Sequence, residues 1–227
     1  MGNIYYITGF KMIKIAPSIL AADLIKIKEE VEIVDKYGAD YIHIDIMDGH
    51  YVPNITFGPN IVKSLRSITN KILDVHLMIS PVEKFVKSFI DAGADIISFH
   101  PEVTNNKTAK IIKKIKDNNC KAGIAIHPNV KISEIIQFIE IIDLVVVMTV
   151  VPGFGGQEFI DSEVKKIIEL KKIKDEKKLK FEIEIDGGIN EKTAQICKKS
   201  GADVLVAGSY IFSENKDDYS KLIDSLR

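Results

Sequence analysis

The sequence predicts a single-domain (β/α)8 barrel, and three observations lead to this prediction. Apolar runs that suit strands alternate with amphipathic helical segments along the whole chain. The tripeptide Gly-Ala-Asp recurs at 38–40, 93–95 and 201–203, each time after a helical stripe and before an apolar run. These glycines are 55 (93 − 38) and 108 (201 − 93) residues apart. Both spacings are close to multiples of about 27 residues, a unit that fits about eight times into the chain, as the barrel requires.

The elements can be placed in order from these patterns. Ile13 to Pro17 forms the first apolar run, and Asp23 can cap a helix that begins at Leu24 and ends before Gly38. A doubly wound open sheet is the competing arrangement, but no glycine-rich turn follows the first strand. We expect strands at 13–17, 41–46, 72–77, 95–99, 121–126, 143–148, 180–185 and 203–206, and helices at 24–37, 58–67, 82–92, 105–117, 132–140, 159–175, 191–199 and 217–226.

The composition argues against several classes of function. The 227-residue chain is 46% hydrophobic, which allows a sizeable core, and its formal net charge of −1 argues against binding to nucleic acid or an anionic membrane. No apolar run approaches the roughly 18–20 residues that span a bilayer. Two cysteines are too few for a disulfide framework and suit a reducing, cytoplasmic compartment. Residues 1–12 lack the signal-peptide and myristoylation patterns and are expected to be a short extension before a barrel domain over 13–227.

Histidine and aspartate residues end three of the predicted strands. His43 and Asp45 alternate with isoleucines at the end of the second strand, His76 ends the third and Asp186 ends the seventh. Each residue alone could be a hydrogen-bonded structural residue, but the C-terminal ends of barrel strands meet at one mouth. Two imidazoles and two carboxylates gathered there would form a site for one divalent metal ion, namely Zn²⁺, Fe²⁺, Mn²⁺ or Co²⁺.

Glycine-rich turns follow the last three predicted strands. Backbone N–H groups in such turns bind phosphate, and the turns after the seventh and eighth strands occupy the usual phosphate position of these barrels. They favour a phosphorylated ligand over plain tight turns, and the loop after the sixth strand is long enough to fold over that ligand. The residues are Gly153, Phe154, Gly155 and Gly156, then Gly187 and Gly188, then Gly208 and Ser209.

Three methionines, Met47, Met78 and Met148, lie at or just beyond strand ends on the predicted mouth. A thioether there can pack against a flat, electron-rich intermediate without donating a proton to it, although filling the core is an equally good role. His100 ends the fourth strand and is expected to support the mouth through hydrogen bonds.

These residues lie within five motifs that resemble the ribulose-phosphate 3-epimerase family over nearly all of 13–227. The chain departs from the family pattern at Val151, where Asn is common, and at Pro101, where Leu is common. Neither is a proposed ligand position, but loss of the Asn amide at 151 is expected to loosen the loop after the sixth strand. The motifs are APSIL (16–20), HIDIMDGHYVPN (43–54), DVHLM (74–78), VMTVVPGFGGQ (147–157) and EIDGGI (184–189).

The resemblance implies a (β/α)8 barrel enzyme of the pentose phosphate pathway that interconverts D-ribulose 5-phosphate and D-xylulose 5-phosphate. It also implies one divalent metal ion and a homo-oligomer. By resemblance, the metal ligands are His43, Asp45, His76 and Asp186, with Asp45 and Asp186 as acid and base. The substrate-binding residues are expected to be Ser18, His76, Met47, Met78, Met148 and the residues of the three glycine-rich turns.

The chemistry of epimerisation fits these residues. A proton next to a ketone must leave from one face and return to the other, so two carboxyl groups on opposite sides are needed. A metal ion would stabilise the enediolate that forms between the two steps. With ribulose 5-phosphate as substrate, we expect Asp45 to accept the proton and Asp186 to donate one.

Two alternatives remain open on the same barrel. One is an epimerase of a six-carbon ketose phosphate such as allulose 6-phosphate, and the other is a non-catalytic phosphosugar-binding barrel. A related decarboxylase or aldolase is less favoured, because those enzymes use Asp-x-Lys-x-x-Asp and Asp45 is followed by Ile46 and Met47.

Overall fold

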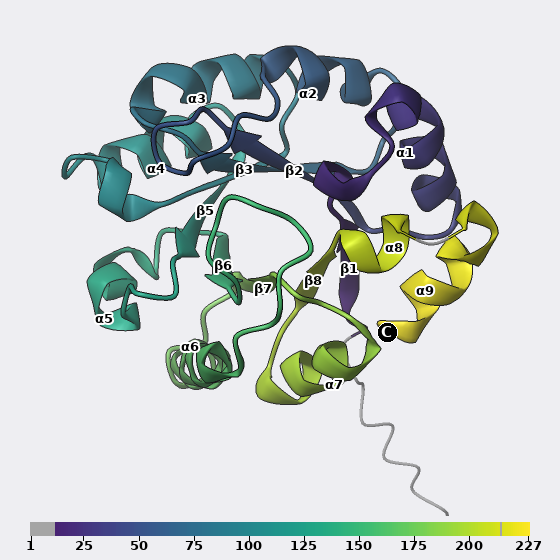
Figure 1. The fold of residues 1–227 in the computed structure, drawn as a ribbon. Coiled ribbons are helices and arrows are strands. Elements are labelled where there is room, and N and C mark those ends of the chain that lie inside the picture. The colour runs from purple at the N-terminus through teal and green to yellow at the C-terminus, as the bar shows by residue number, and fades with distance from the viewer. Residues whose placement is uncertain (1–11, 214) are drawn as a thin grey trace, which may run out of the picture.

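The computed structural model describes residues 12–213 and 215–227. The predicted extension, apart from Met12, therefore lies outside the described residues. Within the described part of the chain, eight parallel strands form one sheet in the order β1-β8-β7-β6-β5-β4-β3-β2, and the sheet curves into a barrel (Figure 1). The strands are β1 (Lys14–Pro17), β2 (Tyr41–Met47), β3 (Ile72–Met78), β4 (Ile96–Phe99), β5 (Lys121–Ile126), β6 (Leu144–Met148), β7 (Glu182–Asp186) and β8 (Val204–Ala207).

The barrel closes between β1 and β2 without a continuous ladder of hydrogen bonds. Near the N-terminal ends of the two strands, Asp40 N donates to Ile15 O at 2.9 Å. Near their C-terminal ends, Ser18 and His43 form an isolated parallel bridge. These contacts complete the predicted (β/α)8 barrel, which is confirmed.

Helices cover the outside of the barrel (Figure 1). No helix among the described residues is long and apolar enough to cross a membrane. The helices are α1 (Ile27–Lys36), α2 (Pro59–Arg66), α3 (Val82–Asp91), α4 (Thr108–Lys116), α5 (Ile132–Ile135), α6 (Val164–Glu176), α7 (Glu191–Ser200), α8 (Ser209–Phe212) and α9 (Tyr219–Ser225).

Several predicted helices are shorter in the structure. The segment expected at 105–117 becomes helical only from Thr108, because Asn105 and Asn106 adopt positive φ angles of 48° and 63°. The segment expected at 132–140 contains one α-helical turn followed by a 3₁₀ turn at Ile136–Phe138. The helices expected from 24, 159 and 217 begin with 3₁₀ turns, at Leu24–Lys26, Asp161–Glu163 and Lys216–Asp218. The four-residue helix α8 was not predicted, because its sequence has no room for a helical repeat.

The alternation of side chains along the strands confirms the predicted two faces. Ile42, Ile44 and Ile46 belong to the large apolar cluster that includes buried residues of the surrounding helices. The intervening residues of β2, from Tyr41 to Met47, do not belong to that cluster. The predicted helix stops are also present, because Gly38, Gly93 and Gly201 follow helices with φ angles of 89°, 103° and 110°.

Candidate active site

The C-terminal ends of β2, β3 and β7 bring the four predicted metal ligands together. His43 Nε2 lies 3.4 Å from Asp45 Oδ1 and 3.8 Å from Asp186 Oδ2. His76 Nδ1 lies 3.4 Å from Asp45 Oδ1 and 3.5 Å from Asp186 Oδ2. One ligand atom from each of the four residues lies within 4.8 Å of all the others. Asp186 therefore lies beside the residues of β2 and β3, although it is far from them in the sequence.

The spacing and the chemistry of this cluster fit a divalent cation. Ligand atoms about 2.0–2.2 Å from a tetrahedral ion are about 3.3–3.6 Å from one another, which is close to the four distances above. His43 Nε2 and His76 Nδ1 are buried and have no hydrogen-bond partner among the described residues. Two unpartnered ring nitrogens that face two carboxylates are a costly arrangement in a protein interior unless an ion joins them.

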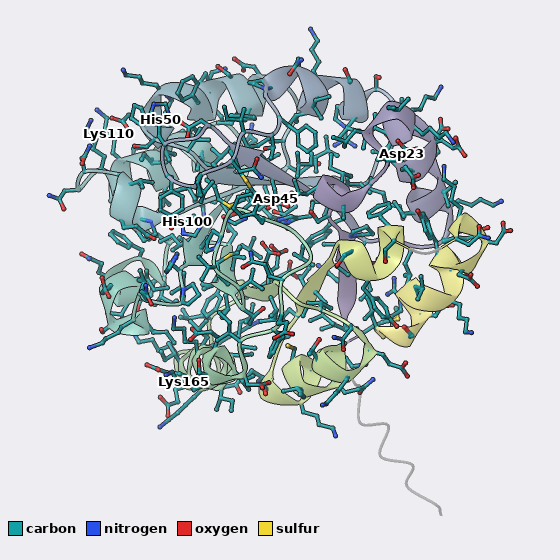
Figure 2. All side chains as sticks on the ribbon, viewed as in Figure 1. Asp23, Asp45, His50, His100, Lys110 and Lys165 are labelled. Atoms are coloured by element: carbon teal, nitrogen blue, oxygen red, sulfur yellow. The ribbon has the colours of Figure 1, made fainter. Side chains whose placement is uncertain are left out.

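The other nitrogen of each histidine has a different partner. His43 Nδ1 lies 2.6 Å from Asp74 Oδ2, a contact between two fully buried side chains. His76 Nε2 lies 3.0 Å from Nε2 of His100, which is also buried. Figure 2 shows Asp45 near the centre of the barrel and His100 to one side of it. His100 thus supports the mouth through a hydrogen bond, as predicted.

Electrostatics within the barrel depend on these contacts. Burial disfavours the charged ring of His43, but the Asp45 and Asp74 carboxylates outweigh burial and raise the pKa of His43. Burial would raise the pKa of Asp45, but His43 and His76 hold that pKa far below its usual range. Burial lowers the pKa of His100 to about 4, so this ring is neutral at neutral pH. The mouth therefore combines the ionised carboxylate of Asp45 with histidine rings of different basicity.

Ser18 is placed next to one of the two carboxylates. Its Oγ donates a 2.7 Å hydrogen bond to Asp45 Oδ2, and both side chains are buried. A hydrogen bond to a charged acceptor is one of the stronger kinds in proteins. Ser18 therefore orients Asp45 and lies at the pocket edge, where the sequence predicts a substrate contact.

A pocket opens directly above the cluster and contains about 580 Å³ of space free of protein atoms, including its mouth. His43 and His76 do not line the pocket, because both rings are fully buried beneath it. Apart from His76, every predicted substrate-binding residue lines the pocket: Ser18, Met47, Met78, Met148, Gly153, Phe154, Gly155, Gly156, Gly187, Gly188, Gly208 and Ser209, together with Asp45 and Asp186.

The loop after β6 passes in front of the strands (Figure 1) and is held by hydrogen bonds to its backbone. Gln157 Nε2 donates to Val151 O at 2.7 Å and to Phe154 O at 2.8 Å. Asn54 Nδ2 donates to Gly153 O at 2.8 Å. Backbone carbonyl oxygens accept all three bonds, so the bonds do not depend on the side chain at position 151. Pro101, the second departure from the family pattern, occupies the first position of a 3₁₀ turn, where no N–H donor is needed.

The turn after β7 requires glycine. Gly187 has a φ angle of 125°, and a Cβ atom there would lie 2.6 Å from Val150 Cγ1. Gly188 has a φ angle of 64°, and a Cβ atom there would lie 2.6 Å from Phe159 N. Thr149 Oγ1 donates to Gly187 O at 2.6 Å and fixes the turn from β6. Only backbone groups can therefore face the ligand at this turn, as an anion cradle needs.

Sequence patterns missed the residues that support the cluster. Asp74 and Glu184 were recognised only as members of the motifs DVHLM and EIDGGI. Both prove to be fully buried inside the barrel. Glu102 and Tyr51 were not singled out, although Tyr51 Oη donates to Glu102 Oε1 at 2.7 Å beside His100. Asp74 could have been found from its place on the same strand face as His76. Glu102 and Tyr51 come from two different loops, and no local pattern connects them.

Comparison with known proteins places the chain in a family. A (β/α)8 barrel with a histidine–aspartate cluster and glycine-rich turns at its mouth is typical of an enzyme that acts on a phosphorylated compound. The chain belongs to the ribulose-phosphate 3-epimerase family, whose sequence profile matches residues 14–212. It is thus an isomerase of the carbohydrate epimerase class.

Relatives from bacteria and plants resemble the chain over almost all of its length. The ribulose-phosphate 3-epimerase of Bacillus subtilis is 46% identical over 217 residues, which cover 95% of this chain and 99% of the relative. The chloroplastic ribulose-5-phosphate-3-epimerase of Arabidopsis thaliana is 44% identical, with 94% and 75% covered. The ribulose-phosphate 3-epimerase of Escherichia coli K12 is 42% identical, with 96% of each chain covered.

Solved structures of more distant proteins share the fold. The 3-keto-L-gulonate-6-phosphate decarboxylase of Vibrio cholerae superposes with a TM-score of 0.71 at 16% identity, with 95% of each chain covered. A mutant tryptophan synthase alpha-subunit of Pyrococcus furiosus gives 0.70 at 14% identity, with 96% of this chain and 97% of that one covered. At these identities the likeness concerns the barrel alone.

Proposed function

We propose that the chain interconverts D-ribulose 5-phosphate and D-xylulose 5-phosphate by two-carboxylate proton transfer, as a step of pentose phosphate metabolism. The observation that supports this most is the joint placement of Asp45 and Asp186 at the pocket and beside the two unpartnered imidazole nitrogens. Membership of the epimerase family supports the same reaction.

Asp45 and Asp186 are suited to act on opposite faces of a substrate. They come from β2 and β7, which are separated around the barrel by β1 and β8. They are also the only carboxyl groups among the described residues that line the pocket. In the direction from ribulose 5-phosphate, Asp45 accepts the C3 proton and Asp186 donates a proton to the other face of C3.

His43, Asp45, His76 and Asp186 would hold one divalent metal ion. Such an ion polarises the oxygens next to the reacting carbon and stabilises the enediolate charge. Ser18 keeps one oxygen of Asp45 oriented while the other faces the histidines. The methionine side chains exclude water from the reacting carbon without offering a proton.

The glycine-rich turns would bind the phosphate group. Gly187 and Gly188, with the start of α8 at Gly208 and Ser209, line one part of the pocket, and Gly153 to Gly156 line the loop that covers it. The distance from these turns to the carboxylates then selects the length of the sugar phosphate.

The direct test measures epimerisation and exchange of the C3 hydrogen with solvent on five-carbon and six-carbon ketose phosphates, before and after chelation. We expect the five-carbon pair to be turned over faster, with both activities lost on chelation. Faster turnover of allulose 6-phosphate would favour the six-carbon alternative. Binding without C3 exchange would favour the non-catalytic phosphosugar-binding alternative.

We also propose a cytoplasmic location and a homo-oligomeric state. Both were expected from the sequence, the first from its low cysteine content and the second from the family resemblance. Size-exclusion chromatography with light scattering tests the second, and fractionation of cells tests the first.

A further inference from the structure

Two ring nitrogens at the mouth, His43 Nε2 and His76 Nδ1, can bind a cation only if neither carries a proton. Each ring therefore needs its proton on the other nitrogen. His43 Nδ1 lies 2.6 Å from the Asp74 carboxylate, so in the neutral ring Nδ1 carries the proton and donates it, and Nε2 is unprotonated. His76 has no such carboxylate partner. Its other nitrogen, Nε2, meets Nε2 of His100 at 3.0 Å.

The hydrogen bond between His76 and His100 has two possible directions with opposite consequences. If His100 Nε2 donates, the proton of His76 is on Nδ1 and points toward Asp45 and Asp186, where it blocks a cation. If His76 Nε2 donates, Nδ1 is free to bind one. His100 must then accept on Nε2 and carry its own proton on Nδ1.

Glu102 favours the second direction. Its Oε1 lies 3.5 Å from His100 Nδ1. That distance is too long for a good hydrogen bond, but a negative charge there still favours a proton on the nearer nitrogen. Tyr51 Oη donates to the same oxygen at 2.7 Å and its ring packs on His100 with centroids 4.7 Å apart. Tyr51 therefore holds Glu102 and His100 in place from the loop after β2.

We propose that His100 is a positioning residue, oriented by Glu102 and Tyr51. It holds His76 in the tautomer in which Nδ1 is unprotonated and can therefore bind a metal ion. The inference rests on the proposed metal site. It gives a role to His100, which is fully buried next to the cluster and does not line the pocket, and to the partly exposed Glu102 beside it.

The test measures Co²⁺ affinity of the metal-free protein by competition with a chromophoric chelator, together with the visible absorption spectrum of bound Co²⁺. His100→Phe keeps the ring that packs on Tyr51 but removes the acceptor. We expect about 10- to 100-fold weaker Co²⁺ binding and an altered spectrum, the usual effect of losing the partner of a metal-binding histidine. His100→Gln restores an acceptor oxygen, so its affinity should return to within about threefold of the unmodified protein.

Two further variants complete the test. Glu102→Gln removes the charge at a partly exposed side chain, and we expect it to bind Co²⁺ more weakly than His100→Gln and more tightly than His100→Phe. If His100→Phe does not fold, the affinity of Glu102→Gln is compared with that of the unmodified protein, which it should not reach. His50→Phe is the matched control, because the exposed ring of His50 contacts Asp48, which is not one of the proposed ligands, and it should bind Co²⁺ normally.

Equal Co²⁺ affinity in His100→Phe and the unmodified protein would overturn the inference, as would equal losses in His100→Phe and His100→Gln. If His100→Phe does not fold, unchanged affinity in Glu102→Gln would overturn it. The proposed function fails in a different way, through an unmodified protein that binds no divalent ion or has no epimerase activity.

Discussion

Replacing Asp186 with Asn separates the two halves of the proposed reaction. Asn has the same shape, so the fold and one ligand oxygen are retained, but it cannot donate the proton that completes epimerisation of ribulose 5-phosphate. No other carboxyl group on that side of the pocket can replace it, because Asp45 is the only other one among its described lining residues. We therefore expect turnover to fall by about 10²- to 10⁴-fold. This loss corresponds to about 2.7–5.4 kcal/mol in the activation free energy.

The assay follows both turnover and deuterium incorporation at C3 in D₂O. Asp186→Asn should still exchange the C3 hydrogen of D-ribulose 5-phosphate, because Asp45 can remove and return a proton on its own face. Asp45→Asn should show the reverse pattern, with exchange retained only for D-xylulose 5-phosphate. Asp143→Asn, at the opposite end of the barrel just before β6, controls for general effects of losing a carboxylate. Turnover near the unmodified rate in Asp186→Asn would refute the two-carboxylate scheme.

Three further predictions concern the metal ion, the phosphate turn and the thiols. Removal of the ion by chelation should abolish activity and lower the unfolding free energy by about 2.7 kcal/mol relative to protein with free ion at 100 times its Kd; an unchanged denaturation midpoint would contradict this. Gly187→Ala should destabilise the fold by at least about 1–3 kcal/mol in urea unfolding, because of its positive φ angle and the contact with Val150. Gly155→Ala, whose Cβ would have no neighbour closer than 3.9 Å, should be nearly neutral for stability. Burial raises the pKa of Cys120 and Cys197 to about 12, so at pH 8 only roughly one thiol in ten thousand is ionised. Labelling by Ellman's reagent should therefore be slow in the native protein, rise with pH and become fast in guanidinium. Fast labelling of the native state would show that the segments around Cys120 and Cys197 open readily.

The sequence was sufficient for the barrel and for the members of the histidine–aspartate cluster. Strand periodicity and the repeated Gly-Ala-Asp stops are local signals that place each strand end in the sequence. Because all barrel strands end at a common mouth, residues at these strand ends can be assigned to one site. That rule is why Asp186 could be placed beside His43 from the sequence. Which ring nitrogen faces the cluster could not be predicted, because it depends on the partners Asp74 and His100 in space.

Helix lengths and the supporting contacts were harder to predict for a related reason. Asn105 and Asn106 delay the start of α4 by adopting a left-handed conformation that Asn tolerates but does not require. Tyr51 and Glu102 lie 51 residues apart and meet only because β2 pairs with β3 and β3 with β4. Such contacts depend on the assembled barrel rather than on any local pattern.

The seam where the barrel closes passes through its reactive end. Near the mouth, the described residues of β1 and β2 are joined by one isolated bridge, between Ser18 and His43, whereas β2 and β3 are in register over seven residue pairs. The same two residues support the chemistry, one as a proposed cation ligand and the other as the donor to Asp45. A cation bound by these residues would link β2, which carries His43 and Asp45, to β7, which ends at Asp186. We therefore expect removal of the proposed ion to weaken the contact between these strands as well as to abolish the activity.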